Sequence, residues 1–324
     1  MPPPSDPAGS PERSGRQPRD PRLALLPGTV TARRGDGSIQ VGLGRRRAQV
    51  PDTEEVRRLL ATLRDGGDPT QLLGPHRAWS GAAATALARL DARGLVVPVG
   101  VLLAAVARER RDPVDPGGLS ALLADDPGTA AGRRAARGAA RWCVDADGRA
   151  EAWAAQVRAL LVASGLQSPP RLARRPTRWE EADGGVLVSL GEPVREVADA
   201  AVRRGLPHLW VAVLPDHARV GPFVVPGVTA CLRCRDATYA EQDPRMLVAL
   251  AHTDGDAGDL APAPADPVAV ATAVALAARD VVTFVDGGVP ATWSGTTEVP
   301  LTGPVRHHAW ERHSWCGCSW DLTG

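Results

Sequence analysis

Two pairs of cysteines near the C-terminal end of the chain constrain its fold most. They are Cys231-Leu-Arg-Cys234 and Cys316-Gly-Cys318, with 81 residues between them. Together they supply four thiolates, the ligand set of a tetrahedral structural zinc site. Because four thiolates leave no open position for water, we expect a structural rather than a catalytic metal. The intervening chain must fold back, so that the metal ties the C-terminal segment to the body of the domain.

Other roles for these cysteines stay open. Disulfides are one, although a Cys-x-Cys bridge is strained and no other feature indicates a secreted protein. Unrelated free thiols are another, and one of three nearby histidines could replace a cysteine as ligand: His307, His308 and His313. The unpaired Cys143 lies within an expected strand, which favours a buried apolar role over that of a nucleophile.

Composition limits the partners of the chain. Its 324 residues are enough for two or three domains, and 38 basic residues nearly balance 37 acidic ones. No overall charge therefore draws it to nucleic acid or to a membrane, and no long uncharged apolar segment predicts a transmembrane span. Residues 1–20 have the composition of a disordered tail and not of a signal peptide. With paired thiols kept for metal, we expect a cytoplasmic protein.

The sequence contains neither lysine nor asparagine, and all of its basic residues are arginine. A GC-rich coding sequence explains the bias. Its chemical consequence is that no lysine can bind phosphate or form a Schiff base, so a P-loop and Schiff-base chemistry are excluded.

The N-terminal part of the chain predicts a small α+β module at 21–70. Alternating apolar residues indicate strands around a Gly35-Asp36-Gly37 turn, and an amphipathic helix follows. Asp52 or Thr53 is its expected N-cap, and its apolar stripe is Val56, Leu59, Leu60 and Leu63. Strands followed by a helix of this size favour a winged-helix-like module. Residues 71–137 are rich in Ala, Leu and Arg and predict a helical connecting region.

The pattern changes at about residue 138, where strands and helices begin to alternate up to residue 324. Short apolar runs such as 185–190 and 208–215 predict buried strands, and 151–166, 193–207 and 266–288 predict helices between or after them. This alternation predicts a mostly parallel sheet with helices on both faces.

The C-terminal half resembles the E1-like superfamily, which includes ThiF, MoeB and the ubiquitin-activating adenylyltransferases. The most specific stretch is Gly221-Pro-Phe-Val-Val-Pro-Gly-Val-Thr-Ala-Cys-Leu-Arg-Cys234, a strand that ends in a Pro/Gly turn and a zinc-type Cys-x-x-Cys. More narrowly, the chain resembles ThiF-like leader-peptide-binding proteins of thiazole/oxazole-modified peptide pathways, which tend to end in Cys-Gly-Cys. The module at 21–70 is similar to their winged-helix peptide-recognition elements. The resemblance implies an α/β fold: a degenerate Rossmann-like E1 (ThiF) domain with a winged-helix-like α+β module.

The chain departs from active members of that superfamily where they bind ATP. Their Gly-x-Gly-x-x-Gly loop lets the backbone approach phosphate. Here the three glycine positions fall on Asp145, Asp147 and Ala150, so two carboxylates would face the phosphate, unless they only shape a surface turn or cap a helix.

Further features of the family's nucleotide site are missing. The family's catalytic lysine is absent. Where the enzymes have a metal-binding Asp and an Asn after the 185–190 strand, this chain has Leu190 and Gly191, and only Arg195 matches the arginine of that motif. The connection between the helix ending near Gly165 and the 185–190 strand is also far shorter than in the enzymes. We therefore expect neither ATP binding nor adenylation.

The function that the resemblance implies is that of a non-catalytic scaffold in ribosomal-peptide maturation. Its N-terminal module would bind a leader peptide as an added strand, through Ile39, Val41, Arg45 and Arg46, although an arginine run at a strand end is often only solvated. The E1-like half would form a homodimer and dock a partner such as a cyclodehydratase. Two alternatives stay open: an active adenylyltransferase that activates a carboxylate with ATP, and a winged-helix regulator that binds nucleic acid.

Overall fold

The structure is a computed structural model, and it describes residues 20–72, 81–107, 116–146, 149–168, 181–246, 248 and 266–318. The chain divides into two compact units. One unit comprises Met1–Arg111 with Leu123–Gly128, and the other comprises Asp112–Leu122 with Thr129–Gly324. Both combine helices and strands, so the predicted α/β class is confirmed at that level. The finer subdivision at 21–70, 71–137 and 138–324 stays a prediction, and the predicted tail lies almost wholly outside the described residues.

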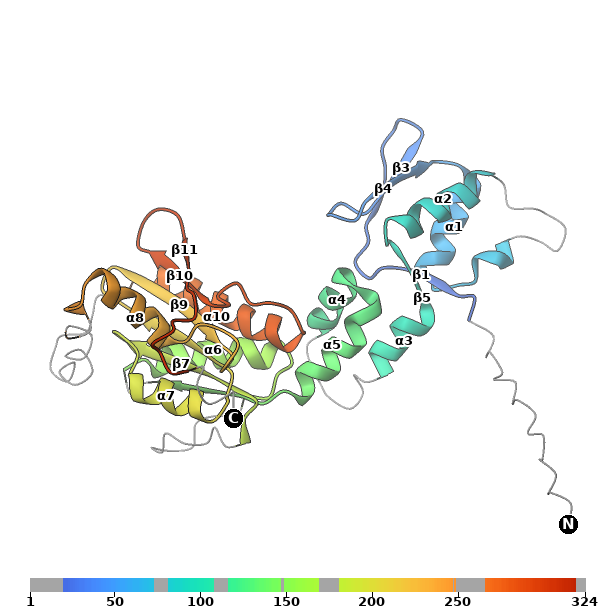
Figure 1. The fold of residues 1–324 in the computed structure, drawn as a ribbon. Helices are drawn as coiled ribbons and strands as arrows, with labels where there is room; N and C mark the ends of the chain where they lie inside the picture. The colour runs from blue at the N-terminus through green and yellow to red at the C-terminus, as the bar shows by residue number, and fades with distance from the viewer. Residues whose placement is uncertain are drawn as a thin grey trace, which may run out of the picture. The chain divides into compact units, whose positions relative to one another are not determined.

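The N-terminal unit contains two small antiparallel sheets and several helices (Figure 1). One sheet has the order β2-β3-β4, and the other pairs β1 with β5. The elements of this unit are β1 (Leu23–Leu25), β2 (Thr31–Arg33), β3 (Ser38–Val41), β4 (Ala48–Pro51), α1 (Glu54–Arg64), η1 (Pro69–Leu72), α2 (Gly81–Ala92), β5 (Val96–Pro98) and α3 (Val99–Ala107). Helix α4 (Pro116–Asp125) contributes its last residues to this unit.

Helix α1 begins and packs as its sequence predicts. The hydroxyl of Thr53 caps it by accepting a hydrogen bond from the backbone N–H of Val56 at 3.3 Å. Its four predicted apolar positions are buried, and they pack against strand residues and against α2. The core of this unit is formed by Leu25, Ile39, Val41, Val50, Val56, Leu59, Leu60, Leu63, Leu90 and Leu95, among others.

The C-terminal unit is built on a six-stranded mixed sheet with the order β11-β10-β9-β8-β7-β6. Strands β6, β7 and β8 run parallel, whereas β8 to β11 pair antiparallel. The prediction of a mostly parallel sheet was therefore wrong, because short turns join β8 to β9 and β10 to β11 as hairpins. The strands are β6 (Trp142–Ala146), β7 (Gly184–Leu190), β8 (His208–Val213), β9 (His217–Val224), β10 (Gly295–Pro300) and β11 (Arg306–Ala309).

Helices cover both faces of this sheet (Figure 1). On one face α6 and α10 pack against alternate strand residues such as Val186 and Val188. On the other face Leu187 and Trp210 pack against α7 and the start of α8. The alternation along β7 places successive side chains in two different cores, as a sheet buried on both sides requires. The covering helices are α6 (Glu151–Ala163), α7 (Arg195–Arg203), α8 (Leu232–Gln242) and α10 (Pro267–Val285), and α5 (Pro127–Ala139) precedes β6 in the chain.

The order in which the chain adds strands to the sheet reverses at β6. After α6 it forms a parallel bridge from Gln167 to Arg141, on the side of β6 that faces away from β7. It then returns to β7, on the opposite side of β6. In open α/β sheets, ligands bind where the strand order reverses in this way, outside the carboxyl ends of the strands. Among the described residues, this position is flanked by Arg149 and Ala150, which precede α6, and by residues 191–194, which follow β7.

Helix α10 is long and apolar enough to cross a membrane, judged by length and composition alone. Its sequence was not expected to do so, since Arg279 and Asp280 interrupt the apolar run. One side of the helix is buried against the sheet through Ala269, Val270, Ala273, Val274, Ala277 and Val281. This side of α10 is apolar because it forms part of the hydrophobic core.

Candidate functional site

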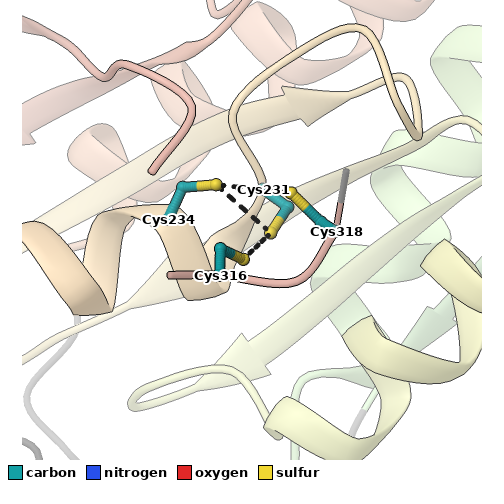
Figure 2. Close-up of side chains that lie close together, drawn as sticks. All are labelled: Cys231, Cys234, Cys316 and Cys318. Atoms are coloured by element: carbon teal, nitrogen blue, oxygen red, sulfur yellow. Dashed lines mark hydrogen bonds between the residues drawn. The ribbon is translucent and has the colours of Figure 1, made fainter. Parts of the chain in front are cut away.

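The structure brings the four predicted cysteines together (Figure 2). The Sγ atoms of Cys231 and Cys316 lie 3.3 Å apart, those of Cys234 and Cys318 lie 3.6 Å apart, and those of Cys231 and Cys234 lie 3.7 Å apart. All four atoms lie within 4.8 Å of one another. Zinc bound tetrahedrally to sulfur would separate the sulfurs by roughly 3.8 Å. The cluster could therefore hold a metal ion such as zinc.

Local structure positions the first pair at the start of a helix. Cys231 is the N-cap residue of α8, and Cys234 lies in its first turn. The N-terminus of a helix carries partial positive charge, which favours thiolates. The second pair lies in the segment after β11, where the backbone N–H of Cys316 donates to the carbonyl of His313 at 3.1 Å. The cluster therefore joins α8 to the C-terminal segment, as the spacing of the cysteines predicts.

The thiols differ in acidity because they hydrogen-bond to one another. Hydrogen bonds from Cys231 and Cys316 lower the pKa of Cys234. The same contacts raise the pKa of Cys231, where the bond to Cys234 is the largest cause. At Cys316 the bond with Cys231 lowers the pKa, but the bond with Cys234 and burial outweigh it and raise the pKa to about 12. A bound cation would take the place of these protons.

The histidines that the sequence offered as alternative ligands make other contacts. His313 Nε2 lies 3.0 Å from Glu241 Oε1, and His307 Nδ1 lies 3.2 Å from Thr297 Oγ1. His308 Nε2 lies 3.4 Å from Glu298 Oε2. Within the part of the chain that the structure describes, the metal-ligating cluster contains cysteines alone.

The fifth cysteine, Cys143, packs beside Leu187 and Trp210 on the α7 face of the sheet. It is half-buried, and burial raises the pKa of its thiol. This environment fits the predicted apolar role of Cys143.

A second group of functional interest, which the sequence analysis missed, is a cluster of buried charges. We call it the charge cluster, and its members are Glu192, Arg195, Arg219, Arg235 and Asp236. These residues come from the turn after β7, from α7, from β9 and from α8. Arg195, which matches the arginine of the E1-like pattern, thus pairs within the protein. The only sequence signal for the cluster was Arg195.

The contacts within the charge cluster are close and mostly charge-assisted. Arg195 Nε donates to Asp236 Oδ2 at 3.0 Å, and Arg235 Nη2 donates to Glu192 Oε2 at 2.8 Å. Arg219 also bonds Glu192. Burial would raise the pKa of Glu192, but the charges of Arg235 and Arg219 outweigh it and lower this pKa to about 2. The charge cluster therefore fixes α8, and with it Cys231 and Cys234, to the end of β7.

The described ends of the predicted degenerate loop, Asp145 and Ala150, lie at the reversal point between β6 and β7. Asp145 is a half-buried residue of β6, and Ala150 is fully buried just before α6, while Asp147 lies outside the described residues. The N-cap residue of α6 is Ala150, whose methyl side chain cannot accept a hydrogen bond, and the first turn of the helix carries Glu151. Glu151 Oε1 lies 3.6 Å from Arg158 Nη2, so this end of α6 carries charges of both signs.

The four residues expected to contact a peptide occupy different environments. The side chains of Ile39 and Val41 are buried in the core, and β3 pairs with a strand on each side, so this strand has no free edge. Arg46 donates to two backbone carbonyls, at Gly94 and Asp125. Arg45 is exposed and lines a surface pocket.

Fold and site together define an α/β protein with a four-cysteine cluster and an N-terminal α+β unit. No protein-family model matches the chain, and no curated protein matches its sequence. Among solved structures, the chain resembles Escherichia coli MccB, with 15% identity and a TM-score of 0.58 over 92% of this chain and 96% of MccB.

Two further solved structures extend the comparison. MccB crystallised with MccA gives 14% identity and a TM-score of 0.59, over 92% of this chain and 99% of MccB. The heterocyclase TruD gives 16% identity and a TM-score of 0.63, over 92% of this chain but only 42% of TruD. At these identities the likeness establishes a shared fold. It agrees with the E1-like resemblance of the sequence at the level of the fold.

Proposed function

We propose that this chain is a non-catalytic E1-like scaffold that binds a precursor peptide through its leader during the biosynthesis of a thiazole- or oxazole-modified peptide. The observation that carries the proposal is the fold. It matches nearly the whole of MccB, which has been crystallised with MccA, and it matches part of the heterocyclase TruD. Because MccB and TruD share this fold, we take it as support for a role of this chain in ribosomal-peptide maturation.

We propose that the chain is non-catalytic because the residues at the reversal point of the sheet do not suit a bound nucleotide. Asp145 replaces the first glycine of a phosphate loop, and Ala150 fills a fully buried position at the third. Arg195 is engaged in the charge cluster, and the chain has no lysine to place beside a phosphate. These features make a triphosphate at the end of β6 unfavourable.

The peptide would add a strand to the outer edge of β4. The backbone N–H of Asp52 bonds the carbonyl of Gly37, so the alternation of an antiparallel pair turns the N–H and C=O of Gln49 away from β3. The Gln49 carbonyl already accepts from Arg89 Nη1 of α2 at 2.8 Å. A peptide N–H would replace this arginine and free it for a peptide carboxylate.

The proposal includes two protein partners, which are a cyclodehydratase and a second copy of this chain. TruD is a heterocyclase, and more than half of it has no counterpart in this chain. The E1-like unit would dock a cyclodehydratase and form a homodimer. A structural zinc at the cysteine cluster would keep the C-terminal segment in place for these contacts.

Fluorescence polarisation tests peptide binding directly. A labelled precursor peptide, taken from the gene neighbourhood, is titrated with the full chain. Saturable binding that is weakened by Arg89→Ala, and unchanged by Arg58→Ala on the exposed side of α1, is the expected result. Failure of every neighbouring precursor peptide to bind would refute the proposal.

An active adenylyltransferase is the second candidate function, because MccB has also been crystallised with ATP. Pyrophosphate exchange into ATP, measured with the precursor peptide present, separates the two. A scaffold gives no exchange above that of a blank, whereas peptide-dependent exchange would replace our proposal with the enzymatic one.

A further inference from the structure

A surface pocket lies beside the turn that joins β3 to β4. Its volume is about 500 Å³. Its walls combine apolar side chains with two guanidinium groups, and the residues that matter here are Leu26, Val30, Leu43, Leu95, Arg45 and Arg46. Its lining ends at Arg46, two residues before β4 begins at Ala48, and β4 is the edge strand that we assign to the peptide.

The pocket is held in shape by its own turn. Arg46 Nη1 donates to the carbonyl of Gly94 at 3.2 Å, and Arg46 Nη2 bonds the carbonyl of Asp125. Gly42 has a φ of +75°, and a Cβ at this position would clash with the carbonyl oxygen of Arg46. Arg46 and Gly42 are therefore positioning residues, and they leave the neighbouring side chains free to face a ligand.

The rim of the pocket exposes apolar surface without an evident structural reason. Leu43 is 68% exposed and Val30 is 51% exposed. Leu43 is an apolar residue at the tip of a turn, where polar residues are usual. Exposed apolar side chains around a concave surface are typical of ligand-binding sites.

Charge indicates which ligand the rim would accept. Arg45 is exposed and has no carboxylate within ion-pair distance among the described residues. Two other surface arginines of this unit are compensated, since Arg33 pairs with Asp52 at 3.2 Å and Arg58 pairs with Glu54 at 3.1 Å. Arg45 differs from these two and also lines a pocket. Asp125 also lines the pocket, so two guanidinium groups face one carboxylate there. The uncompensated charge at the rim is thus positive.

We infer that this pocket receives an apolar side chain of the bound peptide, while Arg45 pairs with a carboxylate one or two residues away along that peptide. The inference rests on the proposed function and names the chemistry of its ligand: an acidic leader with an apolar anchor residue. A peptide strand antiparallel to β4 passes Ala48 as it leaves the sheet edge, so its next residues reach the turn at 42–47.

Matched variants test the inference with the labelled precursor peptide. Leu43→Ser and Arg45→Ala each remove one rim contact, whereas Leu103→Ser and Arg58→Ala change exposed residues of the same types elsewhere in the unit. We expect roughly tenfold weaker binding for each rim variant and less than about twofold for each control. The loss from Arg45→Ala should shrink as salt is raised, since an exposed ion pair is screened.

Two outcomes overturn the inference in distinguishable ways. If the wild type binds the peptide and both rim variants bind like their controls, the pocket is not the anchor site, although the proposed function stands. If the wild type binds no precursor peptide, the proposed function fails and the inference fails with it. A photo-crosslinking amino acid at position 43 provides a second readout, and we expect it to label an apolar peptide residue next to an acidic one. Circular dichroism of Leu43→Ser and Arg45→Ala checks that both are folded.

Discussion

The Sγ atoms of Cys231 and Cys316 lie 3.3 Å apart, although 85 positions separate the two residues in the chain. Cys231 is the N-cap residue of α8 and Cys316 follows β11, so this contact joins two distant parts of the C-terminal unit. A zinc ion shared by the four cysteines would make that junction a strong one, because the free energy of metal binding adds to that of folding.

The first prediction concerns metal content. Purified protein should contain about one zinc per chain, and Cys234→Ser should lose the metal and lower the melting temperature. Cys143→Ser is the matched control, because Cys143 lies outside the cluster, and it should keep the zinc. Inductively coupled plasma mass spectrometry provides the measurement. A metal-free wild type, prepared without chelators, would contradict the assignment.

The second prediction concerns acid stability through Glu192. Its pKa in the folded state is lowered from 4.5 to about 2, so the stabilisation is complete above pH 4.5 and is lost as pH falls toward 2. The shift corresponds to roughly 3 kcal/mol. Urea unfolding between pH 2 and 5 should show a shallower pH dependence for Glu192→Gln than for the wild type. Parallel curves would show that the charge cluster does not carry this effect.

The elements that sequence reasoning predicted well are those with a strong local signal. The stripe of α1 and its cap at Thr53 follow from local periodicity and capping chemistry. The cysteine cluster was predictable because metal-ligand spacing is a local pattern. The antiparallel half of the sheet was not, because apolar runs alone do not reveal strand direction.

The third prediction concerns His208, which is fully buried in β8. Burial lowers its pKa from 6.5 to about 4, and Nδ1 lies 2.8 Å from the carbonyl of Leu206. The folded state thus favours the neutral ring, so stability is complete above pH 6.5 and is lost as pH falls toward 4. The loss should amount to roughly 3 kcal/mol. In His208→Leu, the pH dependence of chemical unfolding between pH 4 and 6.5 should flatten. An unchanged slope in this window would contradict the prediction.

The fourth prediction concerns Asp280, a buried carboxylate of α10. It accepts hydrogen bonds from the backbone N–H groups of Ala291 and Thr292, each at 3.0 Å, and from the hydroxyl of Thr292 at 2.5 Å. Asp280→Ala leaves these donors unpaired and should cost about 3 kcal/mol of unfolding free energy. Thr272→Ala is a control on the exposed side of α10, where the hydroxyl only bonds the helix backbone. A cost below about 1 kcal/mol for Asp280→Ala would show that the turn after α10 relaxes.

Long-range placement explains where site prediction failed. The alternation of Ile39 and Val41 predicts that they share a face of the sheet, but it does not show which strand lies at the edge. In the structure β3 pairs on both sides, and both side chains face the core. The charge cluster joins residues from four separate elements, so no local pattern signals it. Arg45 and Arg46 are neighbours in sequence, yet one supports the turn and the other faces solvent.

The most direct test of the central claim is a fluorescence-polarisation titration of the neighbouring precursor peptide, performed with and without Mg²⁺ and ATP. We predict saturable binding with the same affinity in both conditions, because the chain holds the peptide without using a nucleotide. Binding that requires ATP, or no binding in either condition, would contradict the account of a non-catalytic peptide-binding scaffold.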